Sequence, residues 1–282
     1  MTAVGSDASR EADVDEIEVD LLLEGVYRQY GFDFRQYARG SLKRRLLRRA
    51  ALEGAGTFSG LQERLLHEPA CMERLLLDLS INVTAMFRDP SFYRALRTHV
   101  VPLLRTYPFV RIWNAGCSTG EETLSLALVM LEEGLYDRTR IYATDINETV
   151  LEEARRGLLP LEKMRDYTEN YLAAGGTGAF SDYYVAGYEH AQFDRRLFDN
   201  VVFARHNLTS DRSFNEFQMI VCRNVMIYFD ARLQDHVHGL FHSSLVRFGV
   251  LGLGQKESIS FTRHEHDYQV LNPAERLYRK VQ

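Results

Sequence analysis

The stretch that decides the fold runs from Val110 to Ala127 and reads VRIWNAGCSTGEETLSLA. Its first five residues are rich in β-branched and aromatic side chains, which predicts a buried strand. Small residues at 115–120 predict a tight turn, and the apolar spacing that follows predicts a helix. A strand, a glycine turn and a helix in this order open a βαβ unit of the kind that binds nucleotide-like ligands. Glycine suits the turn because it lets the backbone approach a ligand without an intervening Cβ.

Two carboxylates at the start of this helix, Glu121 and Glu122, narrow the class of ligand. A pyrophosphate favours bare N–H groups and the positive end of a helix dipole, and glutamates there would repel it. S-adenosylmethionine carries a cationic sulfonium and an amino group, so its chemistry fits these acids better than that of a dinucleotide. A simpler interpretation remains open, in which both glutamates only complement the helix dipole.

Further strands are predicted at residues 140–144, 200–204, 217–222 and 248–253, followed by a closing hairpin at 268–271 and 276–281. The second strand ends at Asp145, 25 residues after Gly120, where an acid is expected to hold the hydroxyls of a ribose. Ligands of such sheets lie beyond the carboxyl ends of the strands. We therefore expect Asn207, Asn224 and Tyr228 to lie at the pocket.

The composition of the chain limits its class. Its 282 residues, 45% of them hydrophobic, suffice for one large domain or two modest ones. No apolar run approaches the roughly 20 residues that cross a bilayer, so no direct membrane insertion is expected. Three scattered cysteines fit a reducing cytoplasm without a disulfide framework. Residues 1–20 hold seven acids against one arginine, which predicts an acidic, disordered tail.

A helical pattern follows this tail up to about residue 90. One of its helices is expected to start with Ser41 as N-cap and to pack Leu42, Leu46, Leu47 and Ala50 on one face. Its remaining positions carry five cations without an acid among them: Lys43, Arg44, Arg45, Arg48 and Arg49. Two interpretations stay open for this basic helix, namely a solvated face and a surface that binds an acidic partner or nucleic acid.

Other segments give weaker signals. Residues 80–90 resemble a helix-to-helix linker, and residues 157–199 are irregular, tyrosine-rich and broken by glycine, which fits an insert of short strands and loops. His238 and His242 are spaced as metal ligands on a helix can be. No third ligand has a spacing that completes the set, so no metal is expected.

Five motifs in this order resemble the CheR-type chemotaxis receptor glutamate O-methyltransferase family: INVTAMFRDP, NAGCSTGEE, ATDIN, HNL and CRNVMIYFD. The resemblance runs from about Tyr27 to the last residue. It implies an α/β fold, with a Rossmann-like class I S-adenosylmethionine methyltransferase sheet, a small inserted antiparallel β-subdomain and a preceding all-α domain. We expect a tail at 1–20, the helical domain at 21–90 and the methyltransferase domain at 91–282, with the insert at about 160–200.

The resemblance also implies roles for particular residues, and it replaces the linker interpretation of residues 80–90 with a binding role. The implied cofactor-binding residues are Asn82, Thr84, Arg88, Gly116, Glu121, Asp145, Asn207, Leu208, Asn224 and Val225. Arg88 is expected to orient a carboxylate of the substrate or the donor, and Tyr228 to shape the methyl-transfer end. The basic helix with Lys43, Arg44, Arg45, Arg48 and Arg49 is similar to the family's receptor-docking helix.

The implied reaction is methyl transfer from S-adenosylmethionine to glutamates of the cytoplasmic signalling domain of chemoreceptors, with S-adenosylhomocysteine as product. A cytoplasmic enzyme is expected, and nucleic acid is not an expected partner, because no Asn/Asp-Pro-Pro-aromatic segment follows the fourth strand. Two alternatives remain. One is a non-enzymatic regulatory module that binds S-adenosylmethionine or its product, and the other is a methyltransferase for another substrate.

Overall fold

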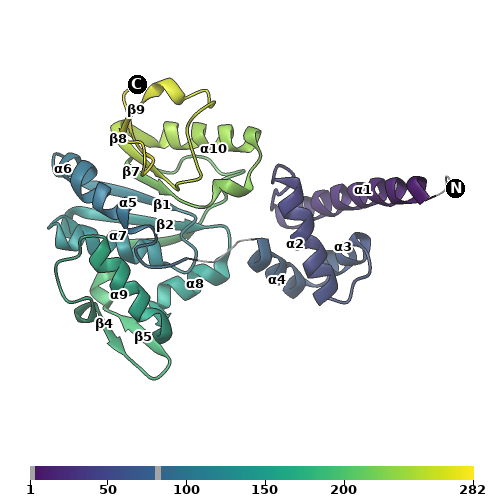
Figure 1. Cartoon of the computed structure of the whole chain (residues 1–282), viewed down its shortest axis with the longest axis horizontal. Helices are drawn as coiled ribbons and strands as arrows, with labels where there is room; N and C mark the ends of the chain where they lie inside the picture. The colour runs from purple at the N-terminus through teal and green to yellow at the C-terminus, as the bar shows by residue number, and fades with distance from the viewer. Residues whose placement is uncertain (1–3, 80–83) are drawn as a thin grey trace. The chain divides into compact units, whose positions relative to one another are not determined.

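The computed structural model describes residues 4–79 and 84–282 (Figure 1). The chain folds into two compact units. The helical unit comprises Met1–Ile81 with Tyr228–Leu233, and the sheet unit comprises Asn82–Ile227 with Gln234–Gln282. This division differs from the predicted boundary at residue 90, because the segment before residue 90 packs with the sheet unit.

Four helices form the helical unit: α1 (Val4–Tyr30), α2 (Arg39–Leu52), α3 (Phe58–His67) and α4 (Pro69–Leu79). The side chain of Thr57 caps α3 by accepting a hydrogen bond from the Gly60 N–H at 3.0 Å. The prediction that Ser41 caps α2 is wrong, because the N-cap is Ala38, which has no side-chain cap. The predicted apolar face of α2 is buried except at Leu47, which is 51% exposed.

The prediction of a disordered tail is also wrong for residues 4–20, which belong to α1. Val19 is fully buried and anchors this end of the helix in the core. The acids that suggested disorder are paired instead. Glu16 accepts hydrogen bonds from Arg39 and Lys43, both at 3.1 Å, and Glu18 accepts from the Ser59 hydroxyl at 2.6 Å. Cations of α2 thus neutralise acids of α1, so the acidic composition of this segment does not prevent it from packing.

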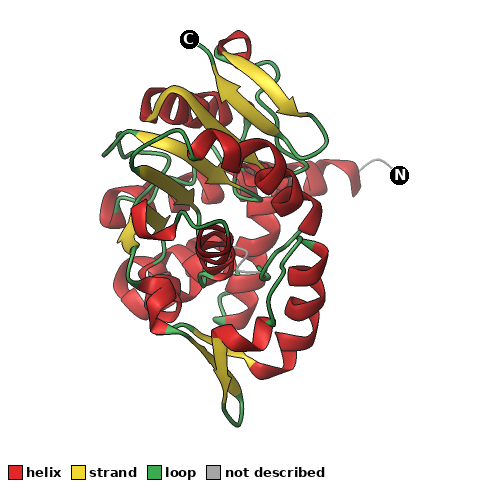
Figure 2. Cartoon of the chain, turned by 90° about the vertical axis from the view of Figure 1, so that its left-hand side faces the viewer, coloured by secondary structure: helices red, strands yellow, loops and turns green. Residues whose placement is uncertain are grey.

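A seven-stranded sheet forms the centre of the sheet unit, in the order β6-β2-β1-β7-β8-β10-β9. Figure 2 draws the strands in yellow. Its strands are β1 (Val110–Ala115), β2 (Thr139–Asp145), β6 (Val201–Arg205), β7 (Phe217–Cys222), β8 (Leu245–Leu253), β9 (Tyr268–Asn272) and β10 (Leu277–Lys280). The pairs β6-β2, β2-β1, β1-β7 and β7-β8 are parallel, whereas β10 runs antiparallel to both its neighbours. The predicted strands and the closing hairpin are confirmed.

Helices cover both faces of this sheet (Figure 1). The helices after residue 84 are α5 (Pro90–Ala95), a π-helix (Leu96–Val100), α6 (Val101–Leu104), α7 (Glu121–Glu132), α8 (Glu148–Arg156), α9 (Met164–Ala173) and α10 (Ala231–Ser244). Alternate residues of β1 serve opposite faces. Val110 and Ile112 join a core shared with α5–α7, whereas the Trp113 ring lies 5.4 Å from that of Phe241 on α10.

The insert between β2 and β6 carries a second sheet of three antiparallel strands, in the order β3-β5-β4. Its strands are β3 (Leu158–Pro160), β4 (Tyr184–Ala186) and β5 (His190–Phe193). The small antiparallel subdomain was predicted, but α9 within it was not. Met164, Tyr167 and Tyr171 recur at helical spacing and are buried, so the tyrosines that suggested irregular structure are core residues.

No helix within residues 4–79 and 84–282 is long and apolar enough to span a bilayer.

Two valines of α1 test whether the segment before Leu21 is packed. Val19→Ala should lower the free energy of unfolding of the helical unit by about 2 kcal/mol, because it removes buried methyl groups. Val14→Ala is the matched control, since Val14 is 53% exposed and its loss should cost less than about 0.5 kcal/mol. Chemical denaturation followed by circular dichroism measures both. If both substitutions change the free energy of unfolding by equally negligible amounts, the segment around Val19 is not packed and the prediction of a disordered tail stands.

Candidate functional site

The carboxyl ends of three parallel strands meet where the glycine turn lies. The backbone N–H groups of Gly116 and Cys117 both donate to the Thr144 carbonyl, at 2.8 and 2.9 Å. The His206 N–H donates to the Asp145 carbonyl at 3.0 Å. These bonds tie the ends of β1, β2 and β6 together, so the predicted residues Gly116, Asp145 and Asn207 belong to one edge of the sheet.

Two glycines of the turn cannot be replaced without displacing a neighbour. Gly116 has φ +79°, and a Cβ built on it would lie 2.4 Å from a methyl carbon of Val225. Gly120 has φ +94°, and its Cβ would lie 2.9 Å from that of Ala154. Both backbone conformations favour glycine. The first contact also brings the segment after β7, which carries Asn224 and Val225, against the end of β1.

Asp145 and Glu121 are buried carboxylates at this edge, 8% and 2% exposed. The two oxygens of Asp145 accept from the N–H groups of Ser118 at 2.9 Å and Asn147 at 3.1 Å. Burial raises the pKa of Asp145, and these hydrogen bonds oppose that change. Burial likewise raises the pKa of Glu121, whose carboxylate accepts from the Thr119 hydroxyl at 2.6 Å. Because each carboxylate oxygen accepts two bonds, both acids retain capacity for a ligand's donors.

The segment before α5 is fixed to the same edge. The Phe87 N–H donates to the Ser125 hydroxyl of α7 at 2.9 Å, and the Asn170 amide donates to the Met86 carbonyl at 3.1 Å. Phe87 and Asp89 have φ values of +51° and +55°, so the chain turns sharply on both sides of Arg88. Of the predicted residues here, Thr84 and Arg88 are partly exposed, and Asn82 lies outside the described residues.

A buried arginine, Arg223, joins this segment to the start of α7. Its side chain is 1% exposed and pairs with Asp89 at 2.7 Å and Glu122 at 2.8 Å. It also donates to the Arg88 carbonyl at 3.0 Å. The amide of Asn114 donates to the same Glu122 carboxylate at 2.8 Å. Glu122 therefore compensates a buried cation, which separates its role from that of Glu121.

Two family models cover almost the whole chain. The all-alpha domain of CheR methyltransferases matches residues 17–80, and their S-adenosylmethionine-binding domain matches residues 82–275. This chain belongs to the CheR methyltransferase family. It is 48% identical over 265 residues to "Putative methyltransferase Cher3" of Pseudomonas putida, covering 94% of this chain and 97% of that protein.

More distant CheR relatives span most of the chain as well. The "Chemotaxis protein methyltransferase" of Listeria monocytogenes is 30% identical over 252 residues, covering 89% of each protein. That of Escherichia coli is 30% identical over 245 residues, covering 83% of this chain and 82% of that protein. The CheR-type recognition and the fold class predicted from the sequence are confirmed. The protein is an S-adenosylmethionine-dependent methyltransferase.

One residue that positions this CheR site was not found from the sequence. Glu257 is 5% exposed, and its carboxylate accepts four backbone N–H groups at 2.7 to 3.0 Å, from Gly254, Asn224, Val225 and Met226. Burial raises its pKa and these hydrogen bonds oppose the change. Asn224 has φ +62°, a conformation that asparagine tolerates better than most residues. Glu257 thus holds Asn224 and Val225 in the shape that reaches Gly116.

The segment after β6 is held by its own side chains. Asn207 and Leu208 are each 7% exposed. The Asn207 N–H donates to the Asp211 carboxylate at 2.9 Å, and its side-chain oxygen accepts from the Thr209 N–H at 3.0 Å. This turn keeps both predicted residues beside the end of β6.

The predicted role of Tyr228 stays a prediction, because Tyr228 and the glycine turn belong to different units. Tyr228 belongs to the helical unit, where the Arg45 guanidinium lies 4.6 Å from the centre of its ring. The Ala38 N–H donates to its carbonyl at 2.8 Å. Residues Tyr228–Leu233, which include the first residues of α10, therefore belong to the helical unit, and the chain rejoins the sheet unit at Gln234.

The five cations of α2 are not equivalent. Arg49 is 9% exposed and pairs with Asp78 at 2.6 Å, which corrects its prediction as a docking residue. Lys43 pairs with Asp15 and Glu16, both at 3.1 Å, and Arg45 donates to the Leu79 carbonyl at 2.6 Å. Arg44 and Arg48 are exposed. Within the described part of the helical unit, these two retain the accessible positive charge of the predicted set.

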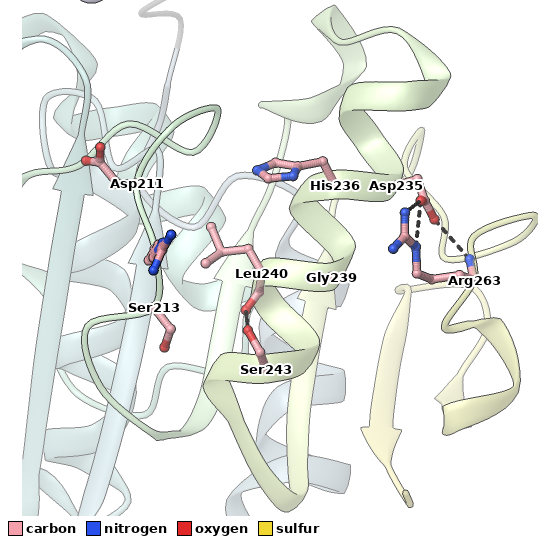
Figure 3. Close-up of a pocket in the computed structure, with 9 residues that line it drawn as sticks. Asp211, Ser213, Asp235, His236, Gly239, Leu240, Ser243 and Arg263 are labelled. Atoms are coloured by element: carbon pink, nitrogen blue, oxygen red, sulfur yellow. Dashed lines mark hydrogen bonds and ion pairs between the residues drawn. The ribbon is translucent and has the colours of Figure 1, made fainter.

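A cavity of about 510 Å³ lies elsewhere in the sheet unit, between residues 211–213 and α10 (Figure 3). The Arg263 guanidinium pairs with Asp235 of α10 at its rim. None of its nine lining residues belongs to the predicted donor site.

The substitution Glu257→Gln tests how far this carboxylate positions the site. An amide of the same shape accepts fewer N–H bonds and brings an N–H₂ group toward backbone donors, so the 224–226 segment should relax. We expect the affinity for S-adenosylmethionine, measured by calorimetry, to fall about 10- to 100-fold. Glu265→Gln is the control, since Glu265 accepts a single N–H, that of Phe261. Unchanged affinity in Glu257→Gln would show that the segment holds its shape without the carboxylate.

Proposed function

We propose that this protein transfers the methyl group of S-adenosylmethionine to glutamate side chains in the cytoplasmic signalling domain of chemoreceptors, giving S-adenosylhomocysteine and a glutamate methyl ester. The observation that carries the proposal is the match of both CheR domains over residues 17–275, together with the buried acids Glu121 and Asp145 at the strand ends. Relatives named chemotaxis protein methyltransferases support the substrate class.

The strand-end residues fit the chemistry of the donor. Gly116 lets the Val225 side chain lie directly against the backbone of the turn, and Asp145 can accept from the two hydroxyls of a ribose. Glu121 can accept from the amino group and attract the positive charge. We assign Asn207 and Leu208 to the adenine, Asn224 and Val225 to the floor beneath the donor, and Asn82, Thr84 and Arg88 to the donor's amino-acid end.

The reaction requires positioning more than proton transfer. S-adenosylmethionine supplies an electrophilic methyl group on its sulfonium. A glutamate side chain with a reference pKa of about 4.3 is already ionised at neutral pH, so no general base is needed. Its oxygen forms a bond to the methyl carbon as the carbon–sulfur bond breaks, and the electron pair stays on sulfur. In this proposal Arg88 orients the incoming carboxylate, Tyr228 shapes the transfer end, and the buried edge excludes water.

The exposed face of α2 fits an acidic, partly apolar partner. Arg44 and Arg48 lie one helical turn apart, and Leu47 and Leu52 beside them are 51% and 63% exposed. A face that mixes cations with exposed leucines suits a helical protein surface better than a nucleic acid, which calls for a continuous basic patch. We assign this face to receptor docking.

Labelled-methyl transfer tests the proposed function. The protein is incubated with methyl-labelled S-adenosylmethionine and a purified chemoreceptor signalling domain, and the product is treated with base. A carboxyl methyl ester releases its label as methanol, whereas N-methyl groups stay bound. Label that resists base would point to another substrate group. Donor binding without transfer to any receptor domain offered would favour the regulatory-module alternative.

Asp145→Ala should weaken the affinity for S-adenosylmethionine at least about 100-fold, because a charged acceptor of two hydroxyls is lost. The control Asp137→Ala removes an exposed acid and should leave the affinity unchanged. Since burial raises the pKa of Asp145, acidification protonates it earlier than an exposed acid. The wild-type affinity should therefore fall as the pH decreases, and less steeply in Asp145→Asn. Calorimetry that gives equal affinities for Asp145→Ala and the wild type would exclude the ribose role.

The double substitution Arg44→Glu/Arg48→Glu should lower kcat/KM for receptor methylation about tenfold at low salt, and less at high salt, because steering between charges is screened. Donor affinity should not change. The matched controls Arg28→Glu and Arg165→Glu reverse exposed charges that are 77% and 87% accessible elsewhere. If the controls lose as much activity as the double variant, net charge and not docking is responsible.

A further inference from the structure

Two histidines and an aspartate converge away from the donor site, near the end of the chain. His242 lies on α10, and His264 and Asp267 flank a 3₁₀ turn (Glu265–Asp267). Each offers one ligand atom, and these atoms all lie within 4.8 Å of one another. The Asp267 carboxylate lies 2.8 Å from Nδ1 of His264 and 3.4 Å from Nε2 of His242. The two imidazole rings are stacked, with centroids 4.2 Å apart.

The unusual atom of this cluster is Nε2 of His242. It is buried and has no hydrogen-bond partner among the described residues. The Asp267 carboxylate lies 3.4 Å from it without forming a hydrogen bond. A cation between this nitrogen and the carboxylate would satisfy both groups.

Imidazole nitrogen and carboxylate oxygen are both common zinc ligands. The nearby ammonium of Lys280 is held by the carbonyls of His242 and Leu245, at 2.7 and 2.9 Å.

The three side chains are held in place by bonds outside the cluster. The Arg263 N–H and guanidinium donate to Asp235 of α10, at 2.9 and 2.8 Å, which fixes the loop that carries His264 (Figure 3). The Val281 N–H donates to the Asp267 carbonyl at 2.8 Å. Such second contacts are what orient metal ligands in known sites.

We propose that His242, His264 and Asp267 bind a divalent transition-metal ion of the zinc class, with water completing its coordination. Tetrahedral zinc bonds of about 2.0–2.2 Å place neighbouring donor atoms about 3.4 Å apart. The His242–Asp267 separation already has this value. The His264 ring, now stacked on His242 at an interplanar angle of 13°, would have to turn out of this arrangement so that its lone pair points at the ion. The ion would join α10 to the hairpin of β9 and β10 and would take no part in methyl transfer.

The sequence alone could not reach this site. The spacing in the sequence suggested His238, four residues earlier on the helix, as the second metal ligand beside His242. His238 is 2% exposed and is not part of the converging set. Burial lowers its pKa to about 4. The two other ligands lie more than 20 positions further along the chain, with no spacing that indicates metal binding.

Equilibrium dialysis of tag-free, chelator-treated full-length protein against Zn²⁺, followed by elemental analysis, tests the proposal. We expect one equivalent of Zn²⁺ per chain, a Zn²⁺-dependent rise in Tm, and no uptake of Mg²⁺. His242→Ala and Asp267→Asn should each lower the Zn²⁺ affinity at least about 30-fold. The controls His236→Ala and His266→Ala remove exposed histidines of the same region and should bind as the wild type does.

Three outcomes would overturn the site. They are no Zn²⁺ uptake by the wild-type protein, equal uptake by the ligand variants and the wild type, and loss of uptake in the control variants. Unchanged affinity for S-adenosylmethionine shows that each variant is folded, because the donor site shares none of these residues. Asp267→Asn keeps the volume of the side chain, so it tests the site even if an alanine variant is unstable.

Discussion

A buried guanidinium is the constraint on which the donor site depends. Arg223 cannot lose its proton, and a charge in the interior is tolerated only when partners compensate it. Its partners, Asp89 and Glu122, belong to the segment before α5 and to the first turn of α7. The charge of one residue at the end of β7 therefore fixes the relation between two segments that lie more than 90 positions away in the sequence. Breaking either pair would leave the buried guanidinium with a single carboxylate partner, so the charge favours keeping both segments in place.

Four acids, three of them buried and Glu122 nearly so, have different roles at this edge of the sheet. Glu122 pairs with Arg223, and Glu257 accepts three backbone N–H groups of the turn that carries Asn224 and Val225, together with that of Gly254. Both are committed to the protein itself. Glu121 and Asp145 keep unused acceptor capacity, and burial raises the pKa of each. In the proposed assignment, a cationic ligand with hydroxyl and amino donors, such as S-adenosylmethionine, would relieve that cost, whereas a phosphate would increase it.

The elements that could be predicted from the sequence are those with strong local patterns. The strand that contains Trp113 and the glycine turn after it are specified by residues that are adjacent in the chain. The packing of α1 was missed because the acids around Val19 are balanced only by cations of α2, and α9 was missed because buried tyrosines resemble loop composition. Glu257 has no local signal at all, since its partners come from a segment about 30 positions earlier. Contacts between residues distant in the sequence thus determine the packing of α1 and the role of Glu257, and local sequence patterns do not predict such contacts. The roles of the individual donor-site residues remain predictions.

A crystal structure of the protein with S-adenosylhomocysteine would test the central claim most directly. We expect the ribose hydroxyls within hydrogen-bond distance of the Asp145 carboxylate, the amino group beside Glu121, and the thioether over the backbone of Gly116 and Val225. A nucleoside bound elsewhere, with Asp145 accepting only from Ser118 and Asn147, would contradict the assignment of this edge as the methyl-donor site.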